Sequence, residues 1–275
     1  MTLRVLLLAH PAGHSLSPAM HDAALRACDI DARYLALDVP PERLEAAVAG
    51  LRASDVAGAN VTIPHKRAVL RWLDERTDVA RAVGAVNTIV RSERGLLGDN
   101  TDGDGFLRAL AELDVVPAGL PAVVLGAGGA ARAVVLALLR AGARVQVHNR
   151  TPARAERLVA ELVGRGTVYA VGREGLEPAV RSARLLVQAT AAGMEGAAEG
   201  ALPLPEGLLP DAGAVVDLVY RPRETPLLAR ARAAGLTVQN GLPMLVHQGA
   251  LAFERWFGRE APVDVMRRAA EEALG

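Results

Sequence analysis

The chain has 275 residues, of which 51% are hydrophobic and 23% are charged, and its 31 Lys and Arg residues balance 31 Asp and Glu residues. This length accommodates two medium-sized domains or one large one, each with its own core. The balanced charge leaves no basic stripe for nucleic acid and no polybasic patch for an anionic membrane, so we expect neither as a partner.

Two further features bear on the cellular location. Cys28 is the only cysteine, so no intrachain disulfide can form, which fits a reducing compartment. The apolar run within residues 1–9 is too short for a signal peptide, and no stretch of about 20 apolar residues is free of charges or of Pro and Gly breaks. We therefore expect a cytoplasmic protein without a membrane span.

Strand-like and helical segments alternate along the whole chain. Short runs rich in Val and Leu predict strands at Arg4–Ala9, Arg33–Val39, Val56–Val61, Ala85–Arg91, Ala122–Leu125, Arg144–His148, Leu185–Ala189, Ala214–Leu218 and Leu236–Gln239. Patterns rich in Ala, Leu and Arg predict helices at Pro18–Ala27, Pro41–Arg52, Gly105–Asp114, Gly129–Ala141, Pro152–Arg165, Pro226–Ala234, Pro243–Trp256 and Pro262–Leu274. This alternation predicts parallel sheets covered by helices on both faces.

The chain divides into two α/β halves. The polar, Gly-rich segment Gly98–Gly105 is predicted to be the hinge between them, and a second crossing is expected near Gln239–Gly241. Two helices follow that crossing, and their sequence does not decide which half they pack against. The stretch Gly193–Pro210, rich in Gly, Pro and Ala, is typical of a mobile surface loop.

Two serines precede the first predicted helix, in His14-Ser-Leu-Ser-Pro18. Hydroxyls and free N–H groups at a helix N-terminus suit a carboxylate ligand. Ser17 can also serve as an ordinary N-cap, so the carboxylate role of Ser15 and Ser17 is a hypothesis.

Lys66 is the only lysine in a chain whose other basic side chains are arginine, and it closes the polar stretch Asn60-Val-Thr-Ile-Pro-His-Lys66. A lysine kept where arginine is otherwise used indicates a site that guanidinium cannot serve, because only the amine can give up a proton when its pKa is lowered. We predict that Lys66 transfers a proton in catalysis. Asp102, in Asn100-Thr-Asp-Gly103, is its expected partner, although a helix-capping aspartate is the ordinary interpretation.

The second half opens with a strand that runs into Gly126-Ala-Gly-Gly-Ala-Ala131. This is the G-x-G-x-x-A form of the dinucleotide fingerprint in a strand–turn–helix context, and it predicts a pyrophosphate resting on the helix N-terminus. The next strand ends in Asn149-Arg-Thr151, where NAD-binding proteins place an acidic residue. Arg150 and Arg154 instead suit the 2′-phosphate of NADP. The six histidines show no metal-binding spacing, so we predict no metal site.

Taken together, these motifs make the chain resemble the shikimate dehydrogenase family over essentially its whole length. The shared motifs are Ser15-Leu-Ser-Pro, Asn60-Val-Thr-Ile-Pro-His-Lys, Gly84-Ala-Val-Asn-Thr, Asn100-Thr-Asp-Gly, Gly126-Ala-Gly-Gly-Ala, Asn149-Arg-Thr, Asp217-Leu-Val-Tyr-x-Pro and Met244-Leu-Val-His-Gln. The resemblance implies reversible, NADPH-dependent reduction of 3-dehydroshikimate to shikimate, in the pathway to chorismate and the aromatic amino acids.

The resemblance also implies an architecture. A substrate-binding α/β domain with a mostly parallel sheet would comprise residues 1–101, completed by C-terminal helices at 241–275. A doubly wound Rossmann-type domain for NADP would comprise residues 102–240, with the active-site cleft between the two domains. The expected partner is the small-molecule substrate, and a homodimer is a possible assembly.

The resemblance assigns roles to individual residues. Lys66 and Asp102 would be catalytic. The substrate would contact Ser15, Ser17, Thr62, Lys66, Asn87, Asp102, Tyr220 and Gln248. The cofactor would contact Asp78, Gly126, Ala127, Gly128, Gly129, Ala130, Asn149, Arg150, Thr151, Arg154, Thr190, Leu218 and Gly241. Two departures from the family pattern put local loop geometry in doubt, namely Ala9-His10-Pro11 for the usual Gly-Asn-Pro and Gln188-Ala-Thr190 for Asn-Ala-Thr.

Two alternatives remain at this stage. One is a quinate/shikimate dehydrogenase, whose relatives often carry an acid after the second nucleotide-domain strand and Thr at the second serine, against Asn149-Arg-Thr and Ser17 here. The other is a non-catalytic NADP(H)-binding sensor of the same fold, which loss of Lys66 or Asp102 would have favoured.

Overall fold

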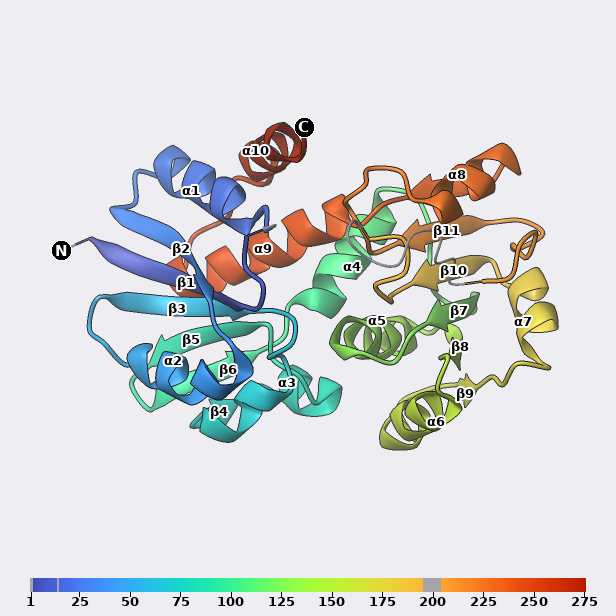
Figure 1. Ribbon diagram of the computed structural model, residues 1–275, viewed down its shortest axis with the longest axis horizontal. Coiled ribbons are helices and arrows are strands. Elements are labelled where there is room, and N and C mark those ends of the chain that lie inside the picture. The colour runs from blue at the N-terminus through green and yellow to red at the C-terminus, as the bar shows by residue number, and fades with distance from the viewer. Residues whose placement is uncertain (1, 14, 195–203) are drawn as a thin grey trace. The chain divides into compact units, whose positions relative to one another are not determined.

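The computed structural model describes residues 2–13, 15–194 and 204–275, which form two compact units (Figure 1). The first unit comprises Met1–Gly105 and Val246–Gly275, and the second comprises Phe106–Leu245. The chain leaves the first unit within helix α4 (Asp102–Ala111) and returns to it within helix α9 (Leu242–Phe257). Both crossings therefore occur inside helices.

The first unit is built on a six-stranded mixed sheet with strand order β2-β1-β3-β5-β6-β4. The pairs β1–β2, β1–β3 and β4–β6 are parallel, whereas β5 pairs with β3 and β6 in antiparallel register. The carboxyl ends of β1, β3 and β6 and the amino end of β5 therefore lie along one edge of the sheet. The strands are β1 (Leu3–Ala9), β2 (Ala32–Asp38), β3 (Val56–Val61), β4 (Glu75–Arg76), β5 (Thr88–Ser92) and β6 (Gly95–Asp99).

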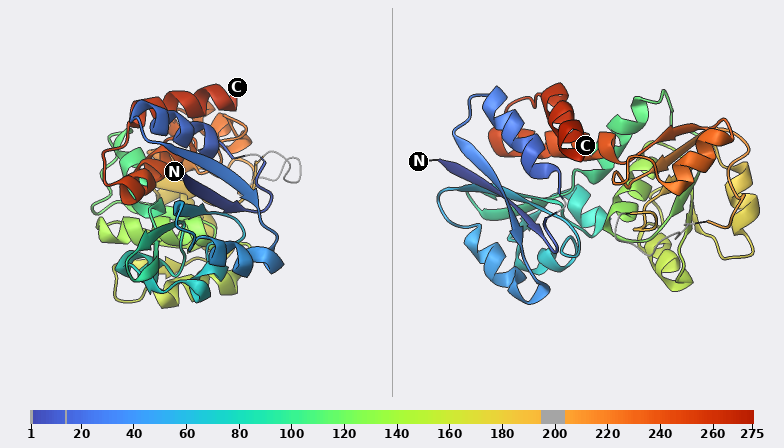
Figure 2. Two further views of the ribbon diagram at one scale, coloured as in Figure 1. Left: turned by 90° about the vertical axis from the view of Figure 1, so that its left-hand side faces the viewer. Right: turned by 45° about the horizontal axis from the view of Figure 1, so that its top comes forward.

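Helices cover both faces of this sheet. One face packs against α2 (Leu44–Gly50), the 3-10 helix η2 (Ala68–Trp72) and α3 (Asp78–Val83), through a buried aliphatic cluster that includes Leu6, Leu8, Leu44, Val48, Val69 and Ala80. On the other face α1 (Ser17–Ala27) and α10 (Val263–Leu274) lie side by side above the sheet, as Figures 1 and 2 show. A short 3-10 helix, η1 (Pro41–Arg43), precedes α2.

The second unit contains a six-stranded, fully parallel sheet with strand order β12-β11-β10-β7-β8-β9. This is the doubly wound order of dinucleotide-binding folds, in which the strand order reverses between β7 and β10. Its central strands β7, β10 and β11 are buried on both faces, as their Val- and Leu-rich runs predict. The strands are β7 (Pro121–Leu125), β8 (Arg144–His148), β9 (Val168–Ala170), β10 (Leu185–Gln188), β11 (Ala214–Asp217) and β12 (Thr237–Gln239).

The helices of the second unit sandwich this sheet. α7 (Leu176–Ser182) and α8 (Pro226–Ala233) contribute to one core cluster with Val123, Leu186 and Val215, and α5 (Gly129–Arg140) covers the opposite side (Figure 1). α6 (Pro152–Glu161) packs beside β8 and β9. Nine consecutive residues of α5, Ala131–Leu139, are buried, which is the pattern of a helix enclosed by its neighbours.

The structure departs from the sequence-based expectation in its short elements. The strands β4, β6 and β9 and the helices α3 and α7 were not predicted. The chain passes to the second unit directly after the predicted hinge Gly98–Gly105, but this segment is not an open linker, because Gly98 and Asp99 end β6 and α4 begins at Asp102. Asn100 Oδ1 accepts the Asp102 N–H (3.2 Å), and acidic residues occupy the first turn of α4, which favours an early helix start.

The predicted surface loop Gly193–Pro210 is only partly described, because residues 195–203 lie outside the described residues. Within the rest of that stretch Leu204, Leu208 and Leu209 are buried in the core cluster of the second unit. These three leucines anchor the segment to α7 and α8 and are not part of a surface loop.

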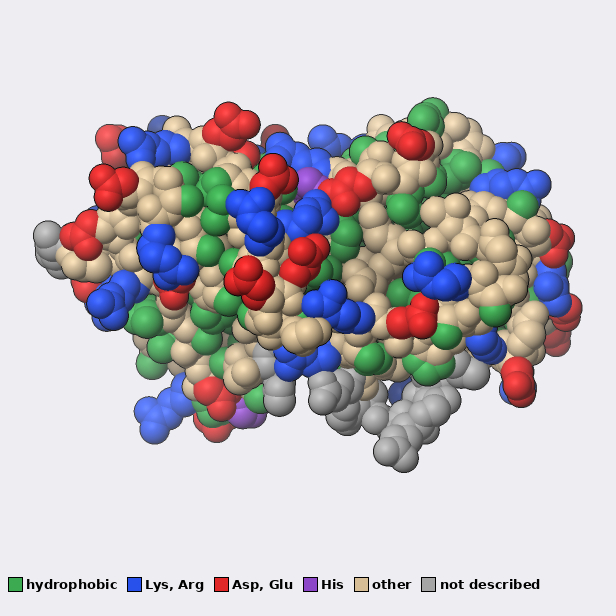
Figure 3. Space-filling view, turned by 90° about the horizontal axis from the view of Figure 1, so that it is seen from above, with side chains coloured by type: hydrophobic (Ala, Val, Ile, Leu, Met, Phe, Trp, Pro, Cys, Tyr) green, Lys and Arg blue, Asp and Glu red, His purple; other side chains and the backbone are tan. Residues whose placement is uncertain are grey.

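Residues 2–13, 15–194 and 204–275 contain no helix that is long and apolar enough to cross a bilayer. They contain no group of three His, Cys, Asp or Glu side chains that could hold a metal ion. On the face shown in Figure 3, acidic and basic side chains are interspersed.

His21 of α1 is a buried imidazole at the junction of α1, β2 and α9. Its ring stacks on Tyr34, with centroids 4.4 Å apart and planes 8° apart, and it lies tilted against Trp256 at 5.3 Å. Neither ring nitrogen has a hydrogen-bond partner among the described residues. Burial lowers the pKa of His21 from 6.5 to about 3, so the folded protein keeps this ring neutral.

This burial predicts a loss of stability in mild acid. Between pH 6.5 and about 3 the unfolded chain binds a proton at His21 that the folded chain does not, so the free energy of unfolding falls as the pH falls. At pH 5 this single group should cost about 2 kcal/mol relative to pH 7. In urea titrations His21→Phe should lose about that much less than the wild type between the two pH values. Equal losses in both proteins would contradict the prediction.

Candidate functional site

The edge of the first sheet gathers the polar motif residues. Asn60 of β3 lies opposite Thr88 of β5, and Thr88 lies opposite Asp99 of β6. The segments that leave this edge carry Thr62 and Lys66 after β3, Asn87 before β5, and Asn100–Asp102 after β6. Antiparallel pairing of β5 thus brings the start of one strand to the ends of its neighbours, and motifs far apart in the sequence meet.

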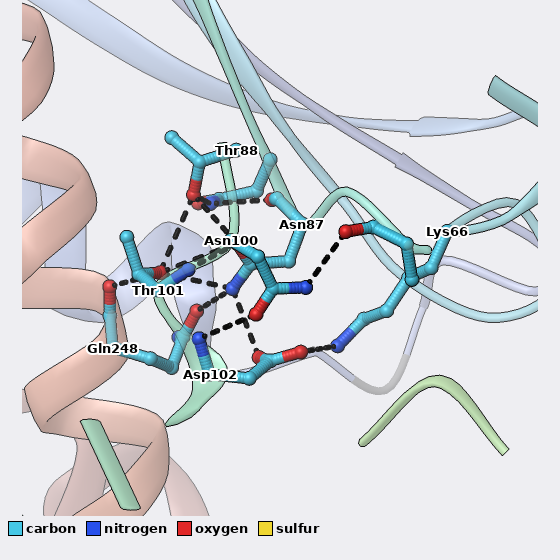
Figure 4. A network of polar contacts seen from close by, with 9 residues as sticks. Lys66, Asn87, Thr88, Asn100, Thr101, Asp102 and Gln248 are labelled. Atoms are coloured by element: carbon cyan, nitrogen blue, oxygen red, sulfur yellow. Dashed lines mark hydrogen bonds and ion pairs between the residues drawn. The ribbon is translucent and has the colours of Figure 1, made fainter. Parts of the chain in front are cut away.

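Lys66 and Asp102 form a partly buried ion pair at this edge. Lys66 Nζ donates to Asp102 Oδ2 at 2.6 Å, and the two side chains are 16% and 4% exposed. The Lys66 backbone is also fixed, because its carbonyl accepts the Val86 N–H at 2.7 Å. The predicted pairing of the sole lysine with Asp102 is present in the structure (Figure 4). Since Lys66 keeps some exposure, its ammonium can reach a ligand as well as the carboxylate.

Asn87 links this pair to its surroundings. Its Nδ2 lies 2.9 Å from Asp102 Oδ1, 2.9 Å from Thr101 Oγ1 and 3.1 Å from Gln248 Oε1, and its Oδ1 accepts the Thr101 N–H at 2.8 Å. An amide nitrogen carries only two hydrogens, so three acceptors share two donors. A ligand hydroxyl can donate to one of these acceptors or accept from the Asn87 amide. The arrangement therefore suits a polyhydroxylated ligand.

Gln248 reaches the site because α9 packs tightly against the start of α4. Thr101 Oγ1 donates to the Gln248 carbonyl at 3.0 Å. A Cβ added at Gly105 would lie 2.6 Å from the Gln248 backbone nitrogen and 2.7 Å from its Cβ. Only glycine allows this approach, so Gly105 is part of the reason that Gln248 and Asn87 meet.

Asp99 was not predicted as a site residue from the sequence, although it supports the segment Asn100–Asp102. Its carboxylate is 7% exposed and accepts from Thr77 Oγ1 (2.7 Å), from the Asn100 N–H (2.8 Å) and from Arg255 Nε (3.0 Å). Arg255 belongs to α9, 156 positions away in the chain. One carboxylate therefore ties α3, α4 and α9 together beside the candidate catalytic pair.

The two serines lie at the start of α1 in the same unit. Ser15 is partly exposed, Ser17 is 6% exposed, and Ser15 Oγ accepts the Ser17 N–H at 3.2 Å. Thr62 is held at the end of β3 by donation of its N–H to the Leu8 carbonyl at 3.0 Å. Asp78, expected on the cofactor side, also belongs to the first unit, where its fully exposed side chain pairs with Arg81 at 3.5 Å.

The second unit carries the dinucleotide fingerprint at the end of β7. Gly126 has φ +118°, which favours glycine, and a Cβ there would lie 3.0 Å from the Ala189 carbonyl. Around Gly128 a Cβ would meet open space, and among the described residues no side chain caps α5. The N–H groups of Gly129 and Ala130 at the first turn of α5, beside Ala127, are therefore available to an anionic group.

The end of the neighbouring strand β8 presents the two predicted arginines. Arg150 and Arg154 are both exposed, before and within the first turn of α6, and Thr151 occupies the N-cap position. Asn149 orders the turn by donating from Nδ2 to the Thr151 carbonyl at 2.9 Å. Cations at a helix N-terminus oppose the helix dipole, so this placement is unfavourable unless an anion binds there.

Gln188 orders the loop after β10, where the family pattern has Asn. Its Oε1 accepts the Thr190 N–H at 2.8 Å, and its Nε2 donates to the carbonyls of Thr190 (3.2 Å) and Ala192 (2.9 Å). The longer side chain therefore closes a local turn here. The other departure, His10, lies 2.8 Å from Asp38 on the surface.

A buried carboxyl supports the loop after β11. Asp217 is fully buried, and burial raises its pKa to about 6, although it accepts from Thr225 Oγ1 at 2.7 Å and from the Val219 N–H at 3.0 Å. This loop carries Leu218 and Tyr220, and burial raises the pKa of the Tyr220 phenol. Gly241 donates its N–H to the Val219 carbonyl at 3.0 Å. Tyr220 thus belongs to the second unit, whereas the other predicted substrate residues belong to the first.

Comparisons with known proteins place this arrangement in a family. Residues 7–89 match the family model described as the shikimate dehydrogenase substrate binding domain, residues 111–196 match shikimate / quinate 5-dehydrogenase, and residues 241–271 match the shikimate 5′-dehydrogenase C-terminal domain.

Individual relatives agree with the family models. A protein of Symbiobacterium thermophilum named shikimate dehydrogenase (NADP(+)) is 54% identical, over 98% of this chain and 93% of the relative, and one of Moorella thermoacetica with the same name is 51% identical over the same shares. The crystal structure of shikimate 5-dehydrogenase from Thermus thermophilus in complex with NADP(H) and shikimate has a TM-score of 0.91 and 47% identity, covering 99% of this chain and 100% of that one. With such identity over nearly its full length, the chain belongs to the shikimate dehydrogenase family.

Proposed function

We propose that the protein is an NADP-dependent shikimate dehydrogenase, which reversibly reduces 3-dehydroshikimate to shikimate with NADPH in the biosynthesis of chorismate and aromatic amino acids. The observation that carries the proposal is the partly buried Lys66–Asp102 pair, which lies beside Asn87 in a chain of this family. We assign substrate binding to the first unit and NADP binding to the second. The bounds of these units lie close to those of the expected domains, which are residues 1–101 with 241–275 and residues 102–240.

Lys66 is assigned the proton transfer. NADPH, when bound, would supply a hydride to the ketone carbon, so the ketone oxygen would need a proton. The Lys66 ammonium donates that proton and stabilises the developing negative charge on the oxygen. Asp102, 2.6 Å from Lys66 Nζ, holds the amine in place and orients the substrate hydroxyl. In the reverse direction the Lys66 amine takes the proton from the alcohol.

The remaining substrate residues hold the ring and its carboxylate. Thr62, Asn87 and Gln248 would bind the ring hydroxyls, because the two N–H donors of the Asn87 amide are shared among three acceptors at this place. Ser15 and Ser17 would bind the carboxylate, together with Tyr220. These groups do not react, and their role is to fix the ring so that one carbonyl faces Lys66.

The residues of the second unit are suited to bind NADP. Gly126–Ala130 would hold the pyrophosphate at the start of α5, and Asn149, Arg150, Thr151 and Arg154 would hold the adenosine 2′-phosphate. Thr190, Leu218 and Gly241 would also contact the cofactor, and Asp78 of the first unit is assigned to the cofactor as well. The positive charge of the exposed arginines at the α6 N-terminus would favour NADP over NAD, because only NADP carries the 2′-phosphate.

One assay separates this proposal from its two alternatives. The absorbance of reduced nicotinamide is followed with shikimate or quinate and with NADP or NAD. Preference for NADP and shikimate supports the proposal, activity on quinate with NAD supports a quinate/shikimate dehydrogenase, and no turnover supports a non-catalytic sensor. A cytoplasmic location and a homodimer stay predictions.

The Lys66→Arg variant tests the proton-transfer role. Arginine keeps the positive charge, but it is bulkier and does not give up its proton near neutral pH. We expect kcat to fall by about 10²–10⁴, the usual contribution of positioned proton transfer, while NADP binding is unchanged. Steady-state kinetics and calorimetric titration of NADP measure the two effects. The converse exchange at an exposed position, Arg43→Lys, should leave kcat unchanged, and a near-normal kcat in Lys66→Arg would refute the role.

The Arg150→Ala variant tests the cofactor assignment. Loss of a charged hydrogen bond to the 2′-phosphate should weaken NADP binding by roughly 1.5–3 kcal/mol. Binding of NAD, which lacks that phosphate, should hardly change. Arg157→Ala, an exposed arginine of the same helix α6, is the matched control and should affect neither cofactor. Equal losses for NADP and NAD in Arg150→Ala would exclude this role for Arg150.

Replacing both Ser15 and Ser17 by Ala tests the carboxylate assignment. The carboxylate is remote from the carbon that receives hydride, so its contacts stabilise the bound substrate and the transition state alike. We expect the KM for shikimate to rise by about tenfold or more, with a much smaller change in kcat. Initial-rate kinetics at saturating NADP measure both constants, and an unchanged KM would rule out the carboxylate role.

A further inference from the structure

Strand β2 (Ala32–Asp38) is the outermost strand on one side of the first sheet, and its outer edge pairs with no other strand of the described chain (Figure 1). Five of its seven residues are exposed, among them Leu35 (39%) and Leu37 (36%). Its charged side chains, Arg33 and Asp38, lie near its ends. Proteins normally shorten, cover or charge such an edge, because an open apolar strand edge pairs readily with another strand. The edge of β2 is therefore suited to pairing.

The two exposed leucines continue a row of core side chains. In the parallel pairing of β1 with β2, Leu6 lies opposite Leu35 and Leu8 lies opposite Leu37. Residues opposite one another on paired strands point to the same face of the sheet. Leu6 and Leu8 belong to the buried cluster under α2 and η2 and are 7% and 0% exposed. The apolar layer of this face therefore extends past β1 to the sheet edge, where it is open to solvent.

The main-chain groups of β2 alternate between β1 and the open edge. Just after the strand, the Val39 N–H donates to the Ala9 carbonyl of β1 at 2.8 Å. Because the N–H and carbonyl of one residue in a parallel strand bond to the same neighbour, and successive residues alternate in direction, odd-numbered residues of β2 face β1. The N–H and carbonyl groups of Tyr34, Ala36 and Asp38 therefore point outward, toward the open edge.

Tyr34 holds β2 in place and uses one of these outward groups. Its ring is 3% exposed and stacks on His21, and its hydroxyl donates to Asn60 Oδ1 at 2.8 Å. Its backbone N–H donates to Asp22 Oδ1 of α1 at 3.0 Å, in agreement with the outward direction. A partner strand has to match the remaining outward groups, since this donor is already used.

A two-fold axis at Ala36 matches these groups. Two antiparallel copies of β2 would then form two hydrogen bonds between the Ala36 residues, and each Asp38 N–H would donate to the Tyr34 carbonyl of the other copy. The Tyr34 N–H is not required for those bonds. Leu35 of one copy lies opposite Leu37 of the other, at positions where Cα atoms are about 4.5 Å apart. The leucines of both copies thus form one apolar patch, and the small Ala36 lies at the axis on the opposite face.

Neighbouring registers fit less well. An axis at Leu35 needs the Tyr34 N–H, which Asp22 already holds, and places Leu37 opposite a charged side chain. An axis at Leu37 brings the two Asp38 carboxylates to diagonal positions, where like charges repel each other. The pattern of β2 is therefore self-complementary about Ala36, which favours a second copy of this chain over an unrelated strand.

We propose that the outer edge of β2 is the contact surface of a homodimer, in which two first units join their six-stranded sheets into one continuous sheet by antiparallel pairing about Ala36. The two-fold axis uses each β2 edge once, so the assembly closes at two copies. This inference goes beyond the proposed function and does not depend on the reaction that the protein catalyses.

Sedimentation velocity of the full-length protein from about 1 to about 100 µM tests the proposal, because an interface of a single strand pair should dissociate on dilution. The wild type should shift from monomer to dimer over this range. The double variant Leu35→Lys with Leu37→Lys removes the apolar contacts and places like charges opposite each other. It should raise the dissociation constant of the dimer about tenfold or more.

Val163→Lys, at an apolar residue of the second unit that is 73% exposed, is the matched control and should dimerise like the wild type. Circular dichroism should show the same fold in all three proteins. A wild type that stays monomeric at the highest concentration, or that forms only larger aggregates, overturns the proposal. Equal dimerisation of the wild type and the double lysine variant overturns it as well, because the contact must then lie elsewhere.

Disulfide trapping tests the register, in a Cys28→Ser background that removes the only native thiol. Cα atoms about 4.5 Å apart can be bridged by a disulfide, whereas diagonal positions about 7–8 Å apart cannot be bridged without movement of the backbone. On oxidation, a mixture of the Leu35→Cys and Leu37→Cys variants should therefore yield more disulfide-linked dimer than either variant alone. Equal yields from the mixture and from a single variant, or no linked dimer at all, would contradict pairing about Ala36.

Discussion

The carboxamide of Asn87 is the point at which the start of β5, the N-terminus of α4 and the middle of α9 meet. Its nitrogen serves acceptors on Thr101, Asp102 and Gln248, and its oxygen accepts from the Thr101 backbone. Asn87, Thr101 and Asp102 are buried, where an unpaired polar group costs about 1–3 kcal/mol. The pairing therefore constrains the chain strongly: β5 must run antiparallel to its neighbours, and α9 must return to the first unit. The orientation of Asp102 toward Lys66 follows from these constraints.

The two units build their candidate sites by different physical means. In the first unit, side chains form the candidate site, and each is held by neighbours within a dense hydrogen-bonded cluster. In the second, the backbone at Gly126–Gly129 and the exposed Arg150 and Arg154 suffice, because a phosphate needs N–H groups and positive charge more than it needs shape. A ring with several hydroxyls has to be recognised by direction, so it requires a prearranged donor and acceptor set, whereas a phosphate can be bound by flexible surface cations.

The sequence predicted the parts of this protein in which local chemistry is decisive. A few adjacent residues suffice to recognise the strands rich in Val and Leu, the Gly126–Ala131 turn and the sole lysine. Local sequence does not reveal the two-residue strand β4 and the short β9, because these strands arise from pairing alone. It does not reveal the contact of Asp99 with Arg255 either, because Arg255 lies more than a hundred positions away. Tyr34 and His21 were missed for a related reason. In a strand and a helix that otherwise read as ordinary packing, an aromatic ring gives no sign of which buried atom its polar end will meet.

The two places where the chain passes between its units have a practical consequence. The unit boundary falls after Gly105 within α4 and after Leu245 within α9, so each crossing is covered by continuous main-chain hydrogen bonding and not by an open linker. A protease that needs an extended substrate finds no preferred cutting point there. For the same reason, excising the nucleotide-binding half for use as a separate module would sever two helices. Chimeras with other dinucleotide-binding proteins are better joined inside the second unit, at the loops after its strands.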